Sequence, residues 1–184
     1  EQKKMLHRAN KKGKLTIIAT EMLGSMVDQP LPSRAETSDV ANGVLDGTDC
    51  VMLSNETATG KHPVKAVKVM AQIVRDAEKA FGELHLHRDL DLPDSIKLNE
   101  ALCETAAHLS WELDERAIAV FTHTGKTVRI LSKYRPQSTI YAVTFNERVY
   151  NRMAFFHNVM PILLDHSVLK SDDVTSESIN QLRD

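Results

Sequence analysis

The stretch of sequence that decides the fold spans residues 14–60 and reads KLTIIATEMLGSMVDQPLPSRAETSDVANGVLDGTDCVMLSNETATG. Two short apolar runs lie in it, at residues 15–19 and 50–53, and each predicts a β-strand. Thr20 follows the first run directly, and Ser54 follows the second. Ligands and chemistry gather at the carboxyl ends of strands in parallel α/β folds. The stretch therefore predicts two neighbouring pieces of one active-site wall.

Helices and strands alternate along the whole chain. The predicted helices cover residues 1–12, 34–45, 63–81, 98–113, 127–133, 147–154 and 172–182, and the predicted strands cover residues 15–19, 50–53, 117–121, 139–143 and 159–164. The βαβα order of the first part is that of a parallel barrel, and the short connections of the second part favour a small open sheet. We therefore expect an α/β protein, with a partial (β/α)8 TIM barrel followed by a small open α/β domain.

The spacing of apolar residues also predicts which face of three helices is buried. The predicted core residues are Met5, Leu6 and Ala9 in the first helix, Val64, Val67, Met70, Ala71 and Val74 in the helix after Pro63, and Leu102, Ala106, Leu109 and Leu113 in the helix over residues 98–113.

The domain boundary is expected in residues 82–97, a polar and acidic segment that we interpret as a linker between residues 1–81 and residues 98–184. A complete barrel of this type needs about 200–250 residues. The first 81 residues supply only two strands of one, so we expect the chain to be a piece of a longer protein. A two-strand remnant is expected to expose apolar edges and faces.

Composition excludes several classes of protein. The formal net charge is -2, so there is no basic excess for a general nucleic-acid or membrane-surface binder. No apolar run reaches the roughly 18 residues of a membrane span. Cys50 and Cys103 lie in apolar stretches without a CxxC partner, which favours buried, reduced thiols of a cytoplasmic protein. The histidines have no zinc-type spacing with cysteine.

Three motifs in the first part resemble pyruvate kinase. Residues 19–26 are similar to the A-T-Q-M-L-x-S-M signature that ends the family's seventh barrel strand. Residues 30–42 are similar to P-x-P-T-R-A-E-x-S-D-V-A-N, and residues 46–60 to D-G-x-D-x-x-M-L-S-G-E-T-A-x-G. A looser similarity continues through residues 135–136 and 141–144. The resemblance implies the last two βα units of the barrel domain and most of the C-terminal effector domain.

The resemblance also implies an activity. Pyruvate kinase transfers a phosphoryl group from phosphoenolpyruvate to ADP in glycolysis, giving pyruvate and ATP, and the family needs Mg²⁺ and commonly K⁺. The ligands of both ions are expected outside this segment, so the chain alone is expected to be inactive. The full-length protein is expected to be a cytoplasmic, allosteric tetramer without nucleic-acid or membrane partners. The alternatives are a catalytically impaired relative and a sugar-phosphate-binding regulatory or assembly module.

The candidate catalytic residue is Thr20. Its hydroxyl can donate to a substrate carboxylate or hold a water for proton transfer, and it can equally end a strand by bonding local backbone. The resemblance matches it to the threonine beside the phosphoenolpyruvate carboxylate and the enolate methyl carbon. Ser54, Glu56 and Thr57 then form a wall of the substrate and nucleotide site. The alternative is a turn in which Ser54 and Thr57 bond backbone groups and Glu56 is solvated.

Arg34 stands at a helix start, where the helix dipole disfavours a cation. We therefore expect a partner for it. The resemblance implies that this helix lies near the active-site mouth and a subunit interface, so the partner is expected either in the substrate site or across that interface. Three residues depart from the family's pattern. Glu21 replaces a common Gln, Asn55 replaces a Gly, and Thr59 stands where many relatives have a Lys near the nucleotide. Asn tolerates left-handed backbone better than other residues with a side chain, so the turn at Asn55 is expected to survive.

A second candidate site is the loop of Thr122, His123, Thr124, Gly125, Lys126 and Thr127, which lies between a predicted strand and a predicted helix. Backbone amides and the helix dipole make such a loop suited to an anion. The resemblance matches it to the family's T-x-S-G-x-[ST] loop, which holds a phosphate of a sugar-phosphate activator. An ordinary capped turn is the alternative. The family's other effector contacts follow residue 184.

Overall fold

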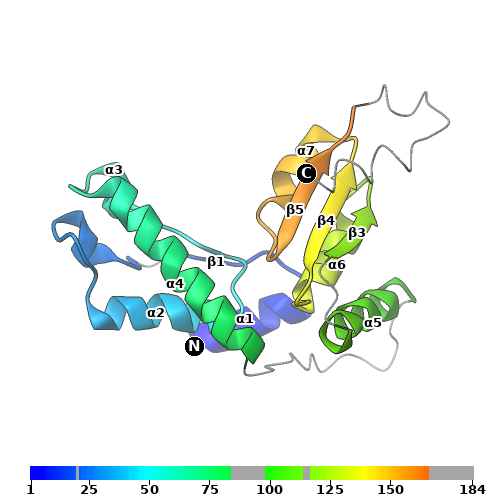
Figure 1. The fold of residues 1–184 in the computed structure, drawn as a ribbon, viewed down its shortest axis with the longest axis horizontal. Helices are drawn as coiled ribbons and strands as arrows, with labels where there is room; N and C mark the ends of the chain where they lie inside the picture. Colours follow the sequence, from blue (N-terminus) through cyan, green and yellow to red (C-terminus); the bar gives the residue numbers. More distant parts are fainter. Residues whose placement is uncertain (20, 84–97, 114–116, 166–184) are drawn as a thin grey trace. The chain divides into compact units, whose positions relative to one another are not determined.

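The structure is a computed structural model that describes residues 1–19, 21–83, 98–113 and 117–165. The chain divides into two compact units, Glu1–Asp89 and Leu90–Asp184 (Figure 1). The boundary falls within the predicted linker, residues 82–97, most of which lies outside the described residues, so the linker stays a prediction. The predicted helix over residues 172–182 also lies outside them.

The first unit has the predicted alternation of helices and strands. Its elements are α1 (Gln2–Lys11), β1 (Ile17–Ile18), η1 (Gly24–Val27, a 3-10 helix), α2 (Arg34–Leu45), β2 (Cys50–Val51), α3 (Asn55–Ala58) and α4 (Pro63–Glu83). β1 and β2 are parallel neighbours, with Ile17 opposite Cys50. The two strands are shorter than the predicted runs. The short helices η1 and α3 lie where loops were predicted, because four residues are too few to show a helical period.

The core of the first unit lies between the two strands and the helices α2 and α4. The buried residues of this core are Leu6, Ile18, Met22, Leu23, Met26, Val40, Ala66, Met70 and Ile73. Ile17 and Met52, by contrast, are 48% and 44% exposed. These exposed apolar side chains are what an open piece of a barrel is expected to show.

The predicted buried face of α4 is partly wrong. Val64 and Val67 are 68% and 52% exposed. Met70 is buried as predicted, and the predicted Val74 packs against the core. The helix otherwise buries residues at a spacing of three and four positions that were not predicted, namely Ala66, Ile73 and Ala77. This stripe is turned by one residue, about 100° around the helix, from the predicted one. It is selected by the packing of α4 against α2. In α1 the prediction is confirmed for Leu6, which is buried, and wrong for Met5, which is exposed; Asn10 is also buried.

The second unit is a three-stranded parallel sheet with helices. Its elements are α5 (Leu98–Glu112), β3 (Ala117–Phe121), α6 (Lys126–Lys133), β4 (Thr139–Thr144), α7 (Glu147–Met153) and β5 (Val159–Leu163). All six predictions are confirmed to within one residue at each end. The strand order is β3-β4-β5, with Ala117 opposite Thr139 and Ile140 opposite Val159.

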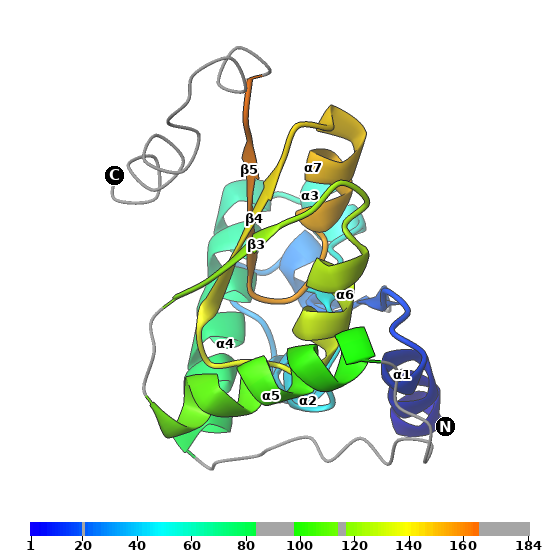
Figure 2. The ribbon, with the colours of Figure 1, turned by 90° about the vertical axis from the view of Figure 1, so that its right-hand side faces the viewer.

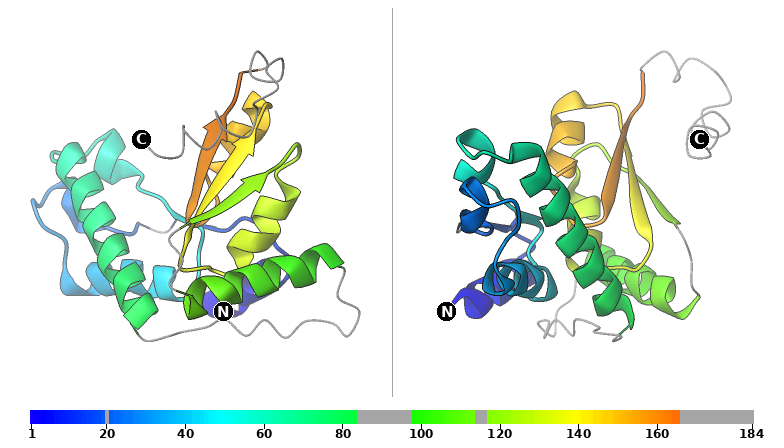
Figure 3. Two further views of the ribbon diagram at one scale, coloured as in Figure 1. Left: turned by 45° about the vertical axis from the view of Figure 1, so that its right-hand side comes forward. Right: turned by 60° about the vertical axis from the view of Figure 1, so that its left-hand side comes forward.

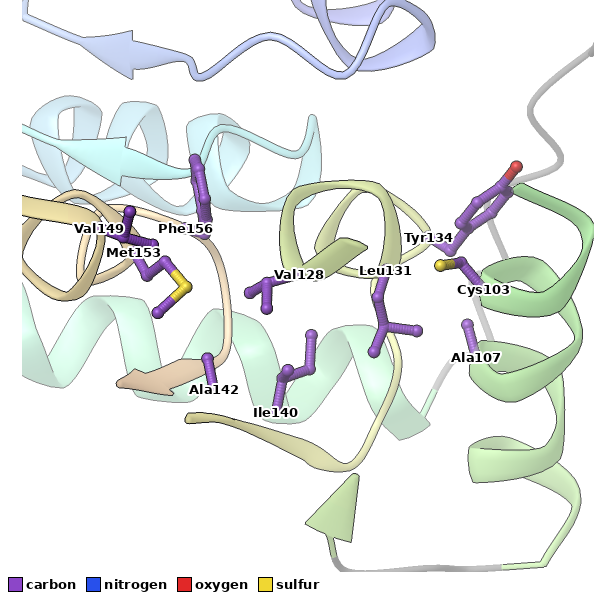
Figure 4. Packing of buried hydrophobic residues seen from close by; sticks show 10 residues of the cluster. All are labelled: Cys103, Ala107, Val128, Leu131, Tyr134, Ile140, Ala142, Val149, Met153 and Phe156. Atoms are coloured by element: carbon purple, nitrogen blue, oxygen red, sulfur yellow. The ribbon is translucent and has the colours of Figure 1, made fainter. Parts of the chain in front are cut away.

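Helices α6 and α7 cover the same face of this sheet (Figures 2 and 3). Their side chains meet those of β4 and α5 in one apolar cluster (Figure 4). The cluster consists of Cys103, Ala107, Val128, Leu131, Tyr134, Ile140, Ala142, Val149, Met153 and Phe156. Phe121 of β3 and Met160 of β5 are both more than half exposed. This exposure of strand residues is unusual, because a parallel sheet is normally covered on both faces.

The predicted buried face of α5 is also partly wrong: Ala106 packs against the apolar cluster, but the three predicted leucines are not buried. Leu102, Leu109 and Leu113 are exposed. Cys103, Ala107 and Ser110 are buried instead, because α5 packs against α6 through that side. Burial raises the pKa of the Cys103 thiol, which keeps it protonated and unreactive.

An ion pair further joins α5 to α6. Lys133, whose side chain is 6% exposed, donates to the carboxylate of Glu100 and lies 4.8 Å from the ring centroid of Tyr134. Burial and the nearby carboxylate raise the pKa of Tyr134. No helix among the described residues has the length and apolar character needed to cross a membrane.

Candidate functional site

The candidate site lies where β1 and β2 end. Thr20 lies outside the described residues, so its position stays a prediction. Glu21, the next residue, has a φ of 32°, in the left-handed region that residues with a side chain rarely adopt. The chain turns here from β1 toward η1, and Met22 and Leu23 enter the core immediately afterwards.

Glu56 occupies the centre of the arrangement. It is 1% exposed, so the alternative of a solvated carboxylate is wrong. One carboxylate oxygen accepts a hydrogen bond from the Leu23 amide at 3.2 Å, and the other accepts one from the Ser54 amide at 2.7 Å. Leu23 belongs to the loop after β1, and Ser54 to the loop after β2. The Glu56 carboxylate therefore joins the carboxyl ends of the two strands.

Glu36 holds the same region from α2. Its carboxylate accepts hydrogen bonds from the amide and hydroxyl of Ser25, each at 2.6 Å, and from the amide and hydroxyl of Ser33, at 2.7 and 2.8 Å. Burial alone would raise the pKa of Glu36, but these four bonds outweigh it and lower the pKa to about 2. The capping box identifies Ser33 as the N-cap of α2.

The loops after the two strands also meet directly. The amide of Lys61 donates to the carbonyl of Val27 at 2.8 Å, and the Lys61 ammonium lies 2.8 Å from the Asp28 carboxylate. Both of those side chains are largely exposed, so this ion pair adds little stability. A side chain at Gly60 would come within 2.5 Å of the Glu56 carbonyl oxygen, which explains the glycine of the motif.

The remaining wall candidates lie at the start of α2 and α3. Ser54 precedes α3 and is exposed, and Thr57 donates its hydroxyl to the Ser54 carbonyl at 3.1 Å. Arg34 is exposed, and its guanidinium makes no ion pair with any residue that the structure describes. Asn55 begins α3 in helical conformation, so it needs no left-handed backbone. Its substitution for Gly therefore causes no backbone strain.

Two family models match the chain in succession. The first describes the barrel domain of pyruvate kinase and matches residues 1–67, and the second describes the alpha/beta domain of pyruvate kinase and matches residues 100–184. The chain belongs to the pyruvate kinase family. It is a partial TIM barrel followed by the alpha/beta domain, as predicted.

Relatives with known names agree with the family models. Pyruvate kinase 2 of Saccharomyces cerevisiae is 44% identical over 166 residues, which cover 89% of this chain and 33% of the relative. Human pyruvate kinase PKLR is 43% identical over 164 residues, which cover 88% of this chain and 29% of the relative. A crystal structure of a pyruvate kinase from Cryptosporidium parvum has a TM-score of 0.89 at 36% identity, over 98% of this chain and 37% of that one. The chain spans about a third of the length of the curated relatives it matches.

The metal ions of pyruvate kinase find no complete ligand set in the described residues. No group of three or more His, Cys, Asp or Glu side chains is arranged there to hold a metal ion. The carboxylates of Glu36 and Glu56 already accept hydrogen bonds from amide and hydroxyl donors. These residues therefore do not fit Mg²⁺ or K⁺.

The second candidate site, in the alpha/beta domain, begins at the end of β3. Gly125 is the N-cap of α6 with a φ of 72°, and it has no side chain to cap the first turn. The Gly125 amide donates to the Thr122 hydroxyl at 2.9 Å, and the Lys126 amide donates to the Thr124 hydroxyl at 3.4 Å. Arg152 of α7 donates to the Thr124 carbonyl. Lys126 and His123 are exposed at this loop.

Proposed function

We propose that the complete protein carrying this chain is a pyruvate kinase that forms pyruvate and ATP from phosphoenolpyruvate and ADP. In this reaction a β-phosphate oxygen of ADP forms a bond to phosphorus while the bond to the enol oxygen breaks. The enolate of pyruvate remains, and its methylene carbon then takes up a proton. The observation that carries the proposal is the succession of two pyruvate kinase domains along one chain.

The residues at the ends of β1 and β2 have distinct proposed roles in this reaction. Thr20 assists proton transfer to the methylene carbon of the enolate, either through its hydroxyl or through a water that it holds. Ser54 and Thr57 form the adjoining wall of the substrate and nucleotide site, and the buried Glu56 supports that wall without facing the substrate. The exposure of Arg34 fits a partner outside the described residues, either a substrate or a neighbouring subunit.

The proposal includes the family's cofactors and setting. Mg²⁺ and K⁺ would offset charge on the transferred phosphoryl group. Both ions would be held by residues outside the described ones. We further propose that the complete protein is a cytoplasmic tetramer.

Pyruvate formation tests this function. The complete protein should turn over phosphoenolpyruvate and ADP with Mg²⁺ and K⁺, while the chain by itself should not. Thr20→Val keeps the shape of the side chain and removes its hydroxyl, so kcat should fall by about 10²–10⁴-fold with a smaller change in the KM for phosphoenolpyruvate. A complete, folded protein without turnover would favour the catalytically impaired relative. A Thr20→Val protein with normal kcat would make Thr20 structural.

We also propose that the loop from Thr122 to Thr127 binds a phosphate group of a sugar-phosphate activator. The glycine N-cap supports this proposal, because it offers no side-chain acceptor to the first-turn amides of α6. In α2 and α7, by contrast, the side chains of Ser33 and Asn146 accept hydrogen bonds from first-turn amides. Lys126 adds a positive charge at the same turn. The bonds from the Gly125 and Lys126 amides to threonine hydroxyls also occur in an ordinary capped turn. A mutation can distinguish the phosphate-binding loop from such a turn.

Lys126→Glu in the complete protein makes that distinction. If the loop holds a phosphate, sugar-phosphate activation should be lost, and maximal turnover at saturating phosphoenolpyruvate should remain. In the wild type, activation should weaken as salt rises, because the contact is charge-assisted. Lys65→Glu, the same charge change on an exposed position of α4, serves as the control. Persistent activation in Lys126→Glu with only a lower melting temperature would leave the loop a capped turn.

A further inference from the structure

We infer that Glu56 is a positioning residue that fixes residues 21–26, the segment that follows Thr20 in the sequence, by joining the carboxyl ends of β1 and β2. Glu56 does so with its two carboxylate oxygens rather than by touching a substrate. The inference rests on the proposed function of Thr20.

The contacts of Glu56 carry this inference. Its side chain comes from α3 and is closed off from solvent, so it cannot present a carboxylate to a ligand in this structure. Its two oxygens are shared between two main-chain amides, one from each loop, at 3.2 and 2.7 Å. Hydrogen bonds from amides to a carboxylate are stronger than those between neutral groups. The side chain thus links the backbone of Ser54 to that of Leu23, which lies 33 residues before Glu56 in the chain.

A second carboxylate fixes the same loop from its other side. Glu36 of α2 holds both polar groups of Ser25, two residues after the amide that Glu56 holds. The side chain of Leu23 is fully buried, and so is that of Met26. Residues 23–26 are therefore held by two carboxylates from different helices and by two apolar anchors. This segment begins three residues after Thr20, and the left-handed turn at Glu21 lies between them.

The precision of this support matters for the proposed chemistry. A misplacement of about 1 Å in a reacting group can reduce the rate by about 10²-fold. Loosening the loop should therefore act on the proton-transfer step more than on the binding of phosphoenolpyruvate.

The opposite ends of the same strands provide a matched comparison. Asp49, just before β2, accepts hydrogen bonds from the amide and hydroxyl of Thr16, just before β1, at 2.9 and 3.0 Å. It also links the two strands through a carboxylate, but at their amino ends. In barrels of this type the carboxyl ends hold the chemistry and the amino ends contribute stability.

The experiment compares Glu56→Gln with Asp49→Asn in the complete protein. A glutamine has one oxygen, so it can accept from only one of the two amides and turns a donor toward the other. Three quantities are measured: the melting temperature, kcat and KM for phosphoenolpyruvate, and the exchange of pyruvate methyl protons with D2O. The exchange is the reverse of enolate protonation and follows that step without phosphoryl transfer.

Glu56→Gln should lower kcat and the exchange rate by about 10- to 100-fold with little change in KM. Asp49→Asn should lower the melting temperature and leave both rates at wild-type values. Normal exchange in Glu56→Gln overturns the inference, and so does an equal loss of exchange in both variants. Should Glu56→Gln fail to fold, Glu36→Gln loosens the same loop, and normal exchange there overturns the inference.

Thr20→Val separates this inference from the function on which it rests. Slow exchange in Thr20→Val with normal exchange in Glu56→Gln contradicts the positioning role alone. Normal exchange in Thr20→Val contradicts both, because no proton-transfer group at Thr20 then remains to be positioned.

Discussion

Removing the charge of Glu36 should make the stability of the first unit less dependent on pH. The pKa of this carboxyl falls from an ordinary value of 4.5 to about 2, because four donors from Ser25 and Ser33 favour its charged form. A pKa that is lower in the folded state stabilises the fold above the unfolded pKa. This stabilisation disappears as the pH falls through the folded pKa. The window for Glu36 thus runs from about pH 5 down to about pH 2.

The magnitude follows from that difference. The full change in pKa corresponds to roughly 3 kcal/mol in the free energy of unfolding at neutral pH. The bonds to Ser33 are exposed to solvent, so screening reduces the contribution. We therefore expect about 1–2 kcal/mol.

The assay is thermal unfolding of the wild type and of Glu36→Gln in the complete protein between neutral pH and about pH 2. The variant should melt at a lower temperature at neutral pH, and the difference should narrow below about pH 5 and close near pH 2. Asp39→Asn, which removes a carboxylate from an exposed position of the same helix, is measured beside it as the matched control. A difference between wild type and Glu36→Gln that stays constant with pH would refute the reasoning.

Three further perturbations test the packing of the second unit. Gly125→Ala should lower the melting temperature by several degrees, because residue 125 has a φ of 72° and an added Cβ would lie 3.2–3.4 Å from α7; an unchanged melting temperature would contradict that geometry. Met153→Ala, at a fully buried position, should cost about 2–5 kcal/mol in denaturant unfolding, and a loss below about 1 kcal/mol would show that the cluster closes around the cavity. Lys133→Ala leaves Glu100 without its ammonium partner and should cost about 1–3 kcal/mol, an effect that Glu100→Gln in the same protein should reduce; additive losses would indicate that the ion pair does not couple them.

The elements of the second unit could be predicted because the sequence marks their ends. Strand β3 is a run of apolar residues that stops at Thr122, and α7 begins after Asn146, whose side chain accepts from the Val149 amide. Such signals are local, so neighbouring residues suffice to read them. The barrel strands were predicted too long, because a strand extends only as far as its neighbours pair with it, and the described part of the barrel contains two strands.

The buried faces of α4 and α5 could not be predicted as reliably as the helices themselves. In both helices the predicted stripe is partly wrong, since exposed apolar side chains such as Val67 and Leu102 lie beside the buried residues. Leucine and valine give a helix two overlapping apolar faces, and periodicity alone does not choose between them. The choice is made by the partner helix, α2 for α4 and α6 for α5. That information lies in packing between elements rather than within either helix.

The candidate site divides in the same way between local and distant information. The capping box of Ser33 and Glu36 is a four-residue pattern, and sequence could have identified it. Its extension to Ser25, and the contact of Glu56 with Leu23, join residues that no local pattern relates. Sequence placed Glu56 at the correct strand end, but it could not distinguish a side chain that faces a substrate from one that holds the backbone. The burial of Glu56 makes that distinction, because a carboxylate whose two oxygens accept from backbone amides holds the loops and does not face a substrate. The motif around Glu56 is therefore best understood as two parts, an exposed Ser54 that faces solvent and a buried Glu56 that fixes the loops.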